Sequence, residues 1–184
     1  MTTYAKYARL PGQIVMLGFG SIGQAVLPLL IRHLDLPDEP ITIFAADANG
    51  AEIARESNAR LVVEAVTPDR PAEDAWRAFM RLRHWQAGST LRPLYDDPAT
   101  RPLLKPEAVF EVENGLALSA FDITAASMAR GDWSDAFRRL FERFDYLIAP
   151  TAQVLPFDAA QAWPHEVAGQ PMATYHEWMK GNCM

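Results

Sequence analysis

The sequence predicts an α/β fold in which a short parallel sheet is followed by a mainly helical segment with one short strand. Residues 14–66 alternate apolar strands with helices around a glycine-rich turn, whereas residues after about 67 show helical periodicity and many prolines. With 184 residues, 49% of them apolar, the chain is long enough to bury a core. We therefore expect a first domain over residues 1–66 and a second over residues 67–184.

The glycine-rich turn follows the apolar run 14–17, which is typical of a strand buried on both faces. A helix is expected from Ser21 to about Leu34, directly after the turn. In a dinucleotide fingerprint the first glycine permits a tight turn, the second lets a pyrophosphate approach the backbone, and the third lets the helix pack on the strand. The helix N-terminus also attracts phosphate. We expect the cofactor to contact the six residues of the turn: Gly18, Phe19, Gly20, Ser21, Ile22 and Gly23.

A second strand is expected over residues 41–46, with Asp47 at its carboxyl end, 24 residues after Gly23. An aspartate there accepts hydrogen bonds from a ribose 2′-hydroxyl and repels a 2′-phosphate, so we expect NAD rather than NADP. A short helix over 51–57 and a third strand over 60–64 complete the region. The three strands predict an incomplete Rossmann-like parallel half-unit.

This first region resembles the start of homospermidine synthase, and the resemblance rests on residues 13–24, 27–29, 32 and 33. That family uses NAD as a bound redox cofactor to join putrescine-derived units. The resemblance covers about residues 1–66 and implies that Gly18, Gly20, Gly23 and Asp47 are cofactor residues. It implies no catalytic residue, because the substrate-binding portion of the family has no counterpart here.

The remainder predicts helices over 72–85, 107–118 and 121–129, and a further helix capped by Ser134. A proline-rich connection containing Pro93 separates the first two. A strand is expected over 146–149, then mostly loop over 152–171, and a last helical turn or two around 175–179. The helices could cover the half-sheet, with 146–149 as an added strand. Marginal stability, or dimerisation through the exposed sheet edge or the apolar helix faces, is an equally fair expectation.

This second region resembles an interior segment of the amidase signature family, and the resemblance covers about residues 68–180. It rests on residues 75–79, 85–86, 104–107, 113–118, 144–151, 154–158 and 163–171. That family hydrolyses amides with a serine nucleophile, a second serine and a lysine in a Gly-Ser-rich core. No such core is present in this sequence, so we assign no catalytic residue. The join between the two regions is expected near residues 63–69.

Composition argues against several classes of protein. The net charge of −6 and the pI near 5.2 disfavour a nucleic-acid partner. The longest apolar stretch, 25–31, is too short to span a membrane, and no signal peptide is recognised, so a cytoplasmic protein is expected. His84, His165 and His176 lack metal-ligand spacing, and we interpret them as surface residues without a metal.

Three interpretations of function remain open. The first is a cofactor-binding module without catalysis, and the second is an active enzyme of either parent family. The third is a product of gene rearrangement without a selected function. The expectation is a chimeric or truncated protein that carries an NAD-binding half-unit and an amidase-family fragment and has no turnover of its own. Polyamine formation with NAD, or amide hydrolysis, is the alternative.

Overall fold

The computed structural model describes residues 4–38, 41–64, 72–150 and 153–183. The chain divides into two compact units. Unit 1 contains residues 1–69 and 136–151, and unit 2 contains residues 70–135 and 152–184. The join expected near residues 63–69 lies largely outside the described residues, and the assignment of 1–66 and 67–184 to two parent families stays a prediction.

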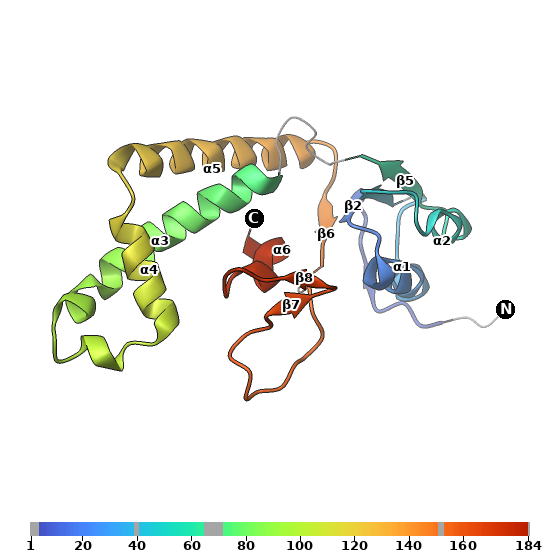
Figure 1. The fold of residues 1–184 in the computed structure, drawn as a ribbon. Coiled ribbons are helices and arrows are strands. Elements are labelled where there is room, and N and C mark those ends of the chain that lie inside the picture. Colours follow the sequence, from blue (N-terminus) through green and yellow to red (C-terminus); the bar gives the residue numbers. More distant parts are fainter. Residues whose placement is uncertain (1–3, 39–40, 65–71, 151–152, 184) are drawn as a thin grey trace. The chain divides into compact units, whose positions relative to one another are not determined.

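Unit 1 is built on a four-stranded parallel sheet with the strand order β5-β4-β2-β6 (Figure 1). The strands are β2 (Ile14–Leu17), β4 (Thr42–Ala45), β5 (Arg60–Val63) and β6 (Tyr146–Ile148). Two short strands, β1 (Ala8–Arg9) and β3 (Leu34–Asp35), form a separate parallel pair that the sequence did not predict. The α/β class and the parallel half-unit are confirmed. The added strand expected at 146–149 is also confirmed, because β6 pairs with β2.

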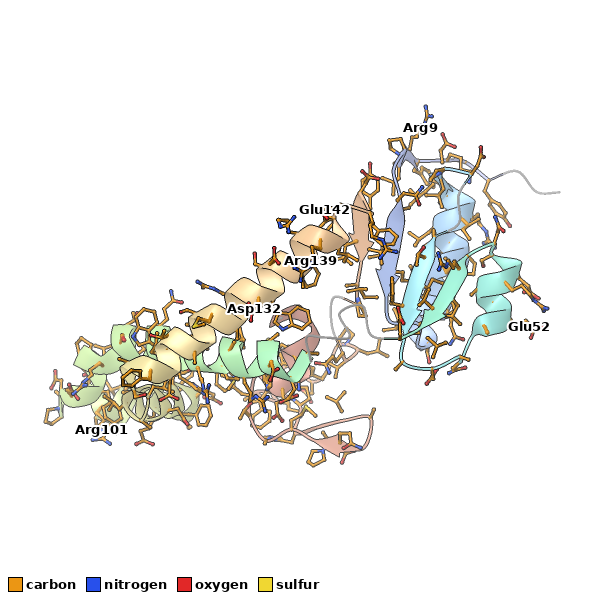
Figure 2. The ribbon with its side chains drawn as sticks, turned by 90° about the horizontal axis from the view of Figure 1, so that it is seen from above. Arg9, Glu52, Arg101, Asp132, Arg139 and Glu142 are labelled. Atoms are coloured by element: carbon orange, nitrogen blue, oxygen red, sulfur yellow. The ribbon has the colours of Figure 1, made fainter. Side chains whose placement is uncertain are left out.

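The sheet of unit 1 is covered on both faces. Its strands alternate, so that Ile14, Met16 and Ile43 face α1 (Ser21–His33) and α2 (Ala51–Glu56) in one apolar core. Val15 and Phe44 face the other way and pack with Leu140, Phe144 and their neighbours in a second core. Figure 2 shows the outer side of α2, where Glu52 points to solvent. The carboxyl-terminal end of the long helix α5 therefore covers the face that a half-unit alone would leave open.

Unit 2 is mainly helical. Its central feature is a hairpin of α3 (Ala72–Asp96) and α4 (Pro106–Leu116), joined through η1 (Arg101–Leu103). The remaining elements are the start of α5 (Ala120–Leu140), the antiparallel strands β7 (Glu166–Val167) and β8 (Gln170–Pro171), η2 (Glu177–Met179) and α6 (Lys180–Cys183). Over the described residues, no helix has the length and apolar character needed to cross a bilayer.

Two helix boundaries predicted from the sequence were wrong. The first helix of unit 2 does not end at 85 but continues past Gly88 and Pro93 to Asp96. Gly88 lies against α4, where an added Cβ would be 3.0 Å from the Glu111 carbonyl oxygen. Gly115 is closer still to the facing helix, since its Cβ would be 2.5 Å from the carbonyl oxygen of His84. At Gly88, close packing of the two helices therefore outweighs the weak helix propensity of glycine.

The two helices expected over 121–129 and from Ser134 are a single helix, α5. Its N-terminus is capped by Ser119, whose Oγ accepts a hydrogen bond from the Asp122 amide over 3.2 Å, while the Asp122 carboxylate accepts one from the Ser119 amide over 3.0 Å. Ser134 lies inside the helix and does not cap it. The region 152–171, expected to be mostly loop, also contains the β7–β8 hairpin, whose turn uses positive φ at Ala168 and Gly169.

Candidate functional site

The candidate site lies at the carboxyl end of β2, where the chain turns into α1. Gly18 has a φ of +82°, and its amide donates to the carbonyl oxygen of Phe44 over 2.8 Å. A Cβ at Gly23 would lie 2.9 Å from the Gly18 carbonyl oxygen and 3.3 Å from the Phe19 ring. Glycine is therefore required at both ends of the turn, for conformation at Gly18 and for close packing at Gly23.

Gly20 has a different environment from the other two glycines. It is the N-cap of α1, with an extended backbone, and a Cβ placed on it would meet no heavy atom within 4 Å. The space above this residue is therefore open. The first turn of α1 carries no acidic side chain, so the positive end of the helix dipole is not neutralised there. This arrangement suits an anion such as a pyrophosphate.

The other three residues expected in the turn have different placements. Phe19 is 4% exposed and belongs to the core on the α1 face, so its side chain is turned away from the open space. Its carbonyl oxygen accepts a hydrogen bond from Gln24 Nε2 over 2.8 Å. Ser21 is exposed on the first turn of α1, and Ile22 is 55% exposed. Ser21 and Ile22 can therefore contact a ligand with side chain and backbone, whereas Phe19 can do so only with its backbone.

Asp47 lies two residues beyond the end of β4, at the same edge of the sheet as the glycine turn. Because β4 pairs with β2 in parallel, the hydrogen bond from Gly18 to Phe44 joins the carboxyl ends of the two strands. The Asp47 side chain is exposed, and Oδ1 accepts a hydrogen bond from the Asn49 amide over 2.9 Å. The structure therefore places an exposed carboxylate on the β4 side of the glycine turn.

A small, mostly apolar cavity of about 60 Å³ lies on the other side of the turn, against β6. Its walls come from β2, the turn and α1, and from the end of β6. The lining residues are Met16, Leu17, Gly18, Ile22, Gly23, Val26, Ile148, Ala149 and Pro150. The last three were not among the residues expected to form the site. The strand at 146–149 was expected, but periodicity alone does not say which neighbour a strand pairs with.

Unit 2 contains a buried polar cluster centred on Glu111 of α4. The Glu111 side chain is 2% exposed, and its Oε2 lies 2.8 Å from His84 Nδ1. Oε1 accepts a hydrogen bond from Tyr175, lies 2.9 Å from His176 Nε2 and is 3.2 Å from Arg83 Nε. We call these five residues the Glu111 cluster. It ties α4 to α3 and to the carboxyl-terminal segment.

The environment of Glu111 sets its charge. Burial alone would raise its pKa, but the close approach of His176 and the hydrogen bonds from His84 and Tyr175 outweigh burial and hold the pKa well below its usual value of 4.5. Burial and the bond to Glu111 in turn raise the pKa of the Tyr175 hydroxyl. Glu111 is therefore an ionised acceptor inside the unit.

The interpretation of His84 and His176 as surface residues was wrong, because both are buried beside Glu111. Sequence spacing gave no signal for this, since His84 lies in α3, Glu111 in α4 and His176 in the turn before η2. Within the described ranges, no group of three His, Cys, Asp or Glu side chains has a geometry that could hold a metal ion. The cluster is a structural anchor of unit 2.

Comparison with known proteins assigns relatives to the first part of the chain. Residues 14–79 match the family described as the saccharopine dehydrogenase NADP binding domain. The chain is 36% identical over 73 residues to a homospermidine synthase of Blastochloris viridis, covering 40% of this chain and 15% of that protein. It is 36% identical over 61 residues to a homospermidine synthase of Mesorhizobium japonicum, covering 33% of this chain and 13% of that protein.

A solved structure is similar over most of the chain. It is a bacterial aryl acylamidase of the amidase signature family, with a TM-score of 0.58 and 16% identity, and the match covers 94% of this chain and 34% of that one. At this identity the likeness concerns the fold alone. The N-terminal segment is thus similar in sequence to homospermidine synthases and to a nicotinamide-dinucleotide-binding family, and the fold is partly similar to an amidase signature enzyme.

Proposed function

We propose that this chain binds a nicotinamide dinucleotide through unit 1. The observation that carries the proposal is the open space above Gly20 at the N-terminus of α1, with the Asp47 carboxylate at the end of the adjacent strand. The similarity to homospermidine synthases and to the saccharopine dehydrogenase NADP binding domain points to the same cofactor class, NAD(P). When bound, such a cofactor accepts or donates a hydride at its nicotinamide ring.

Within that class, the proposed ligand is NAD. An exposed aspartate at the end of the second strand of a dinucleotide fold accepts hydrogen bonds from the adenosine ribose and repels the 2′-phosphate of NADP. Asp47 has this position, and its Oδ1 is already held by the Asn49 amide, which limits the orientation of the carboxylate. The residues of the turn would hold the pyrophosphate, with Gly20 allowing the close approach and the amides of α1 donating to it.

We further propose that the chain is a chimera whose two regions come from different families and that it has no turnover of its own. The sequence similarity of the first region and the amidase-like fold support two origins. The chain spans 15% and 13% of the two homospermidine synthases and 34% of the acylamidase. Most of the length of each relative therefore has no counterpart in this chain. Turnover of putrescine with NAD, or of a simple amide, would contradict the absence of activity. The turnover would have to disappear when a single residue of this chain is substituted, which excludes a contaminating enzyme.

The test of cofactor binding is isothermal titration of the full chain with NAD⁺ and NADP⁺. The diagnostic variant is Gly20→Glu, which places bulk and negative charge where the pyrophosphate would lie. Gly131→Glu is the matched control, because a Cβ at Gly131 also meets no heavy atom within 4 Å but lies in α5 of unit 2. We expect saturable NAD⁺ binding by the wild type and the control, and a loss of at least about 100-fold in affinity in Gly20→Glu. Equal binding by all three proteins, or none by a folded wild type, would contradict the proposal.

A further inference from the structure

The strand β6 lies at the point where the sheet reverses its order. From β2 the chain runs to β4 and then to β5 on one side, and it later returns to place β6 on the other side of β2. In open parallel sheets, ligands bind outside the carboxyl ends of the strands at such a switch point. Here the switch point is the space between the carboxyl ends of β2 and β6, directly beside the glycine turn.

The carboxyl end of β6 faces the glycine turn across the small cavity described above. Ile148, Ala149 and Pro150 line that cavity together with Gly18, Ile22 and Gly23. Pro150 Cγ lies 3.9 Å from the position that a Cβ of Gly18 would take, so the two segments are in van der Waals range. Ile148 is partly buried against the core, whereas Ala149 and Pro150 are exposed.

The placement of Asp47 determines which half of a dinucleotide would reach this wall. Asp47 lies on the β4 side of the turn, where it would hold the adenosine ribose. The open space above Gly20 would take the pyrophosphate. A dinucleotide that continues in the same direction passes from β4, over β2, toward β6. Its second nucleoside then meets the end of β6.

We propose that Ile148, Ala149 and Pro150 form the wall that contacts the nicotinamide nucleoside half of the bound cofactor. This inference rests on the proposed function. The wall lies outside residues 14–79, which match the NADP-binding family, and inside the region 68–180 that resembles an amidase segment. The cofactor site is therefore composite: the first region binds adenosine and pyrophosphate, and the second region contributes the opposite wall.

The experiment compares NAD⁺ with ADP, which carries the adenosine and pyrophosphate but no nicotinamide nucleoside. Ala149→Trp adds neutral bulk to the wall, and Ala8→Trp is the control, because Ala8 is exposed in the same unit and does not line the cavity. We expect Ala149→Trp to weaken NAD⁺ binding at least about tenfold while ADP affinity changes less than about twofold. Retained ADP binding also shows that the variant is folded. Pro150→Ala, which removes the ring beside Gly18, is a milder variant. It is judged by the ratio of NAD⁺ affinity to ADP affinity, as for Ala149→Trp.

The outcomes separate the two proposals. If the wild type binds NAD⁺ and ADP, and the ratio of the two affinities is unchanged in both Ala149→Trp and Pro150→Ala, the proposed role of the wall is wrong. The proposed function then remains in place. Equal weakening of both ligands in both variants also overturns the wall. A folded wild type that binds neither ligand overturns the proposed function and the wall with it.

Discussion

The backbone of Gln13 is held by Asp145, 132 positions later in the chain. The Gln13 amide donates to Asp145 Oδ2 over 2.7 Å, and the Gln13 carbonyl oxygen accepts from the amides of Asp145 and Tyr146 over 2.8 and 3.0 Å. These bonds align the start of β6 with the start of β2, so that Ile14 pairs with Tyr146. The carboxyl ends of the two strands, which form the candidate site, are positioned by this contact at their other ends.

Gly12 is the residue that lets Asp145 approach. A Cβ at Gly12 would lie 2.3–2.5 Å from three side-chain atoms of Asp145, which is inside van der Waals contact. We therefore expect Gly12→Ala to displace β6 and to lower the free energy of unfolding by about 1–3 kcal/mol in urea titrations. Gly131→Ala is the control, since that position is open and helical, and it should raise stability by up to about 1 kcal/mol. A Gly12→Ala protein as stable as the wild type would contradict the alignment of β2 and β6.

Glu111 anchors unit 2, so Glu111→Gln should be strongly destabilising. The amide keeps the shape of the side chain but removes the charge that its neighbours His84, His176 and Arg83 surround. We expect a loss of about 3 kcal/mol in unfolding free energy. Glu113→Gln is the matched control on the same helix. Glu113 is exposed, accepts a hydrogen bond from the Tyr95 hydroxyl and lies 3.9 Å from Arg101 Nη2, so Glu113→Gln should change the unfolding free energy much less. Equal effects of the two substitutions would rule out the anchoring role.

The Glu111 cluster also predicts how stability depends on pH. The pKa of Glu111 is held below its usual value of 4.5, so the ionised form stabilises the folded state. That contribution is fully present above about pH 4.5 and is lost as the pH falls toward the lowered folded value. The difference in unfolding free energy between wild type and Glu111→Gln should therefore shrink from about pH 6 to about pH 3. A difference that stays constant or grows on acidification would show that Glu111 is not ionised in the folded state.

Asp47 is expected to set the choice between NAD⁺ and NADP⁺. Asp47→Ala removes the carboxylate that would accept from the ribose and repel a 2′-phosphate, so the preference for NAD⁺ should fall at least about tenfold. The substitution also removes the bond to the Asn49 amide. Asp97→Ala controls for that loss, because Asp97 makes the same type of bond to the Ala99 amide in unit 2. The selectivity role is wrong if the ratio of the two affinities is the same in all three proteins.

Apart from the two-residue strand β3, the order of elements in residues 14–64 was predictable, because each of the other strands, the glycine turn and the two helices has a local signal. The glycine pattern identified the turn, and Asp47 followed from its spacing. The helices of unit 2 were harder to predict, because α3 continues through Gly88 and Pro93. At Gly88, close packing against α4 outweighs the low helix propensity of glycine. The pairing of β6 with β2, and the burial of His84 and His176 around Glu111, depend on contacts between distant segments that local sequence does not encode.

In the proposed complex, a dinucleotide lies across the carboxyl ends of β4, β2 and β6 in unit 1. An amide NMR titration of the full chain with NAD⁺ tests it most directly, because each backbone amide reports its own environment. We expect saturable shifts in three separate segments: the glycine turn from Gly18 to Gly23, the neighbourhood of Asp47, and Ile148 with Ala149. Shifts confined to unit 2, or no shifts in the glycine turn of a folded protein at saturating NAD⁺, would contradict it.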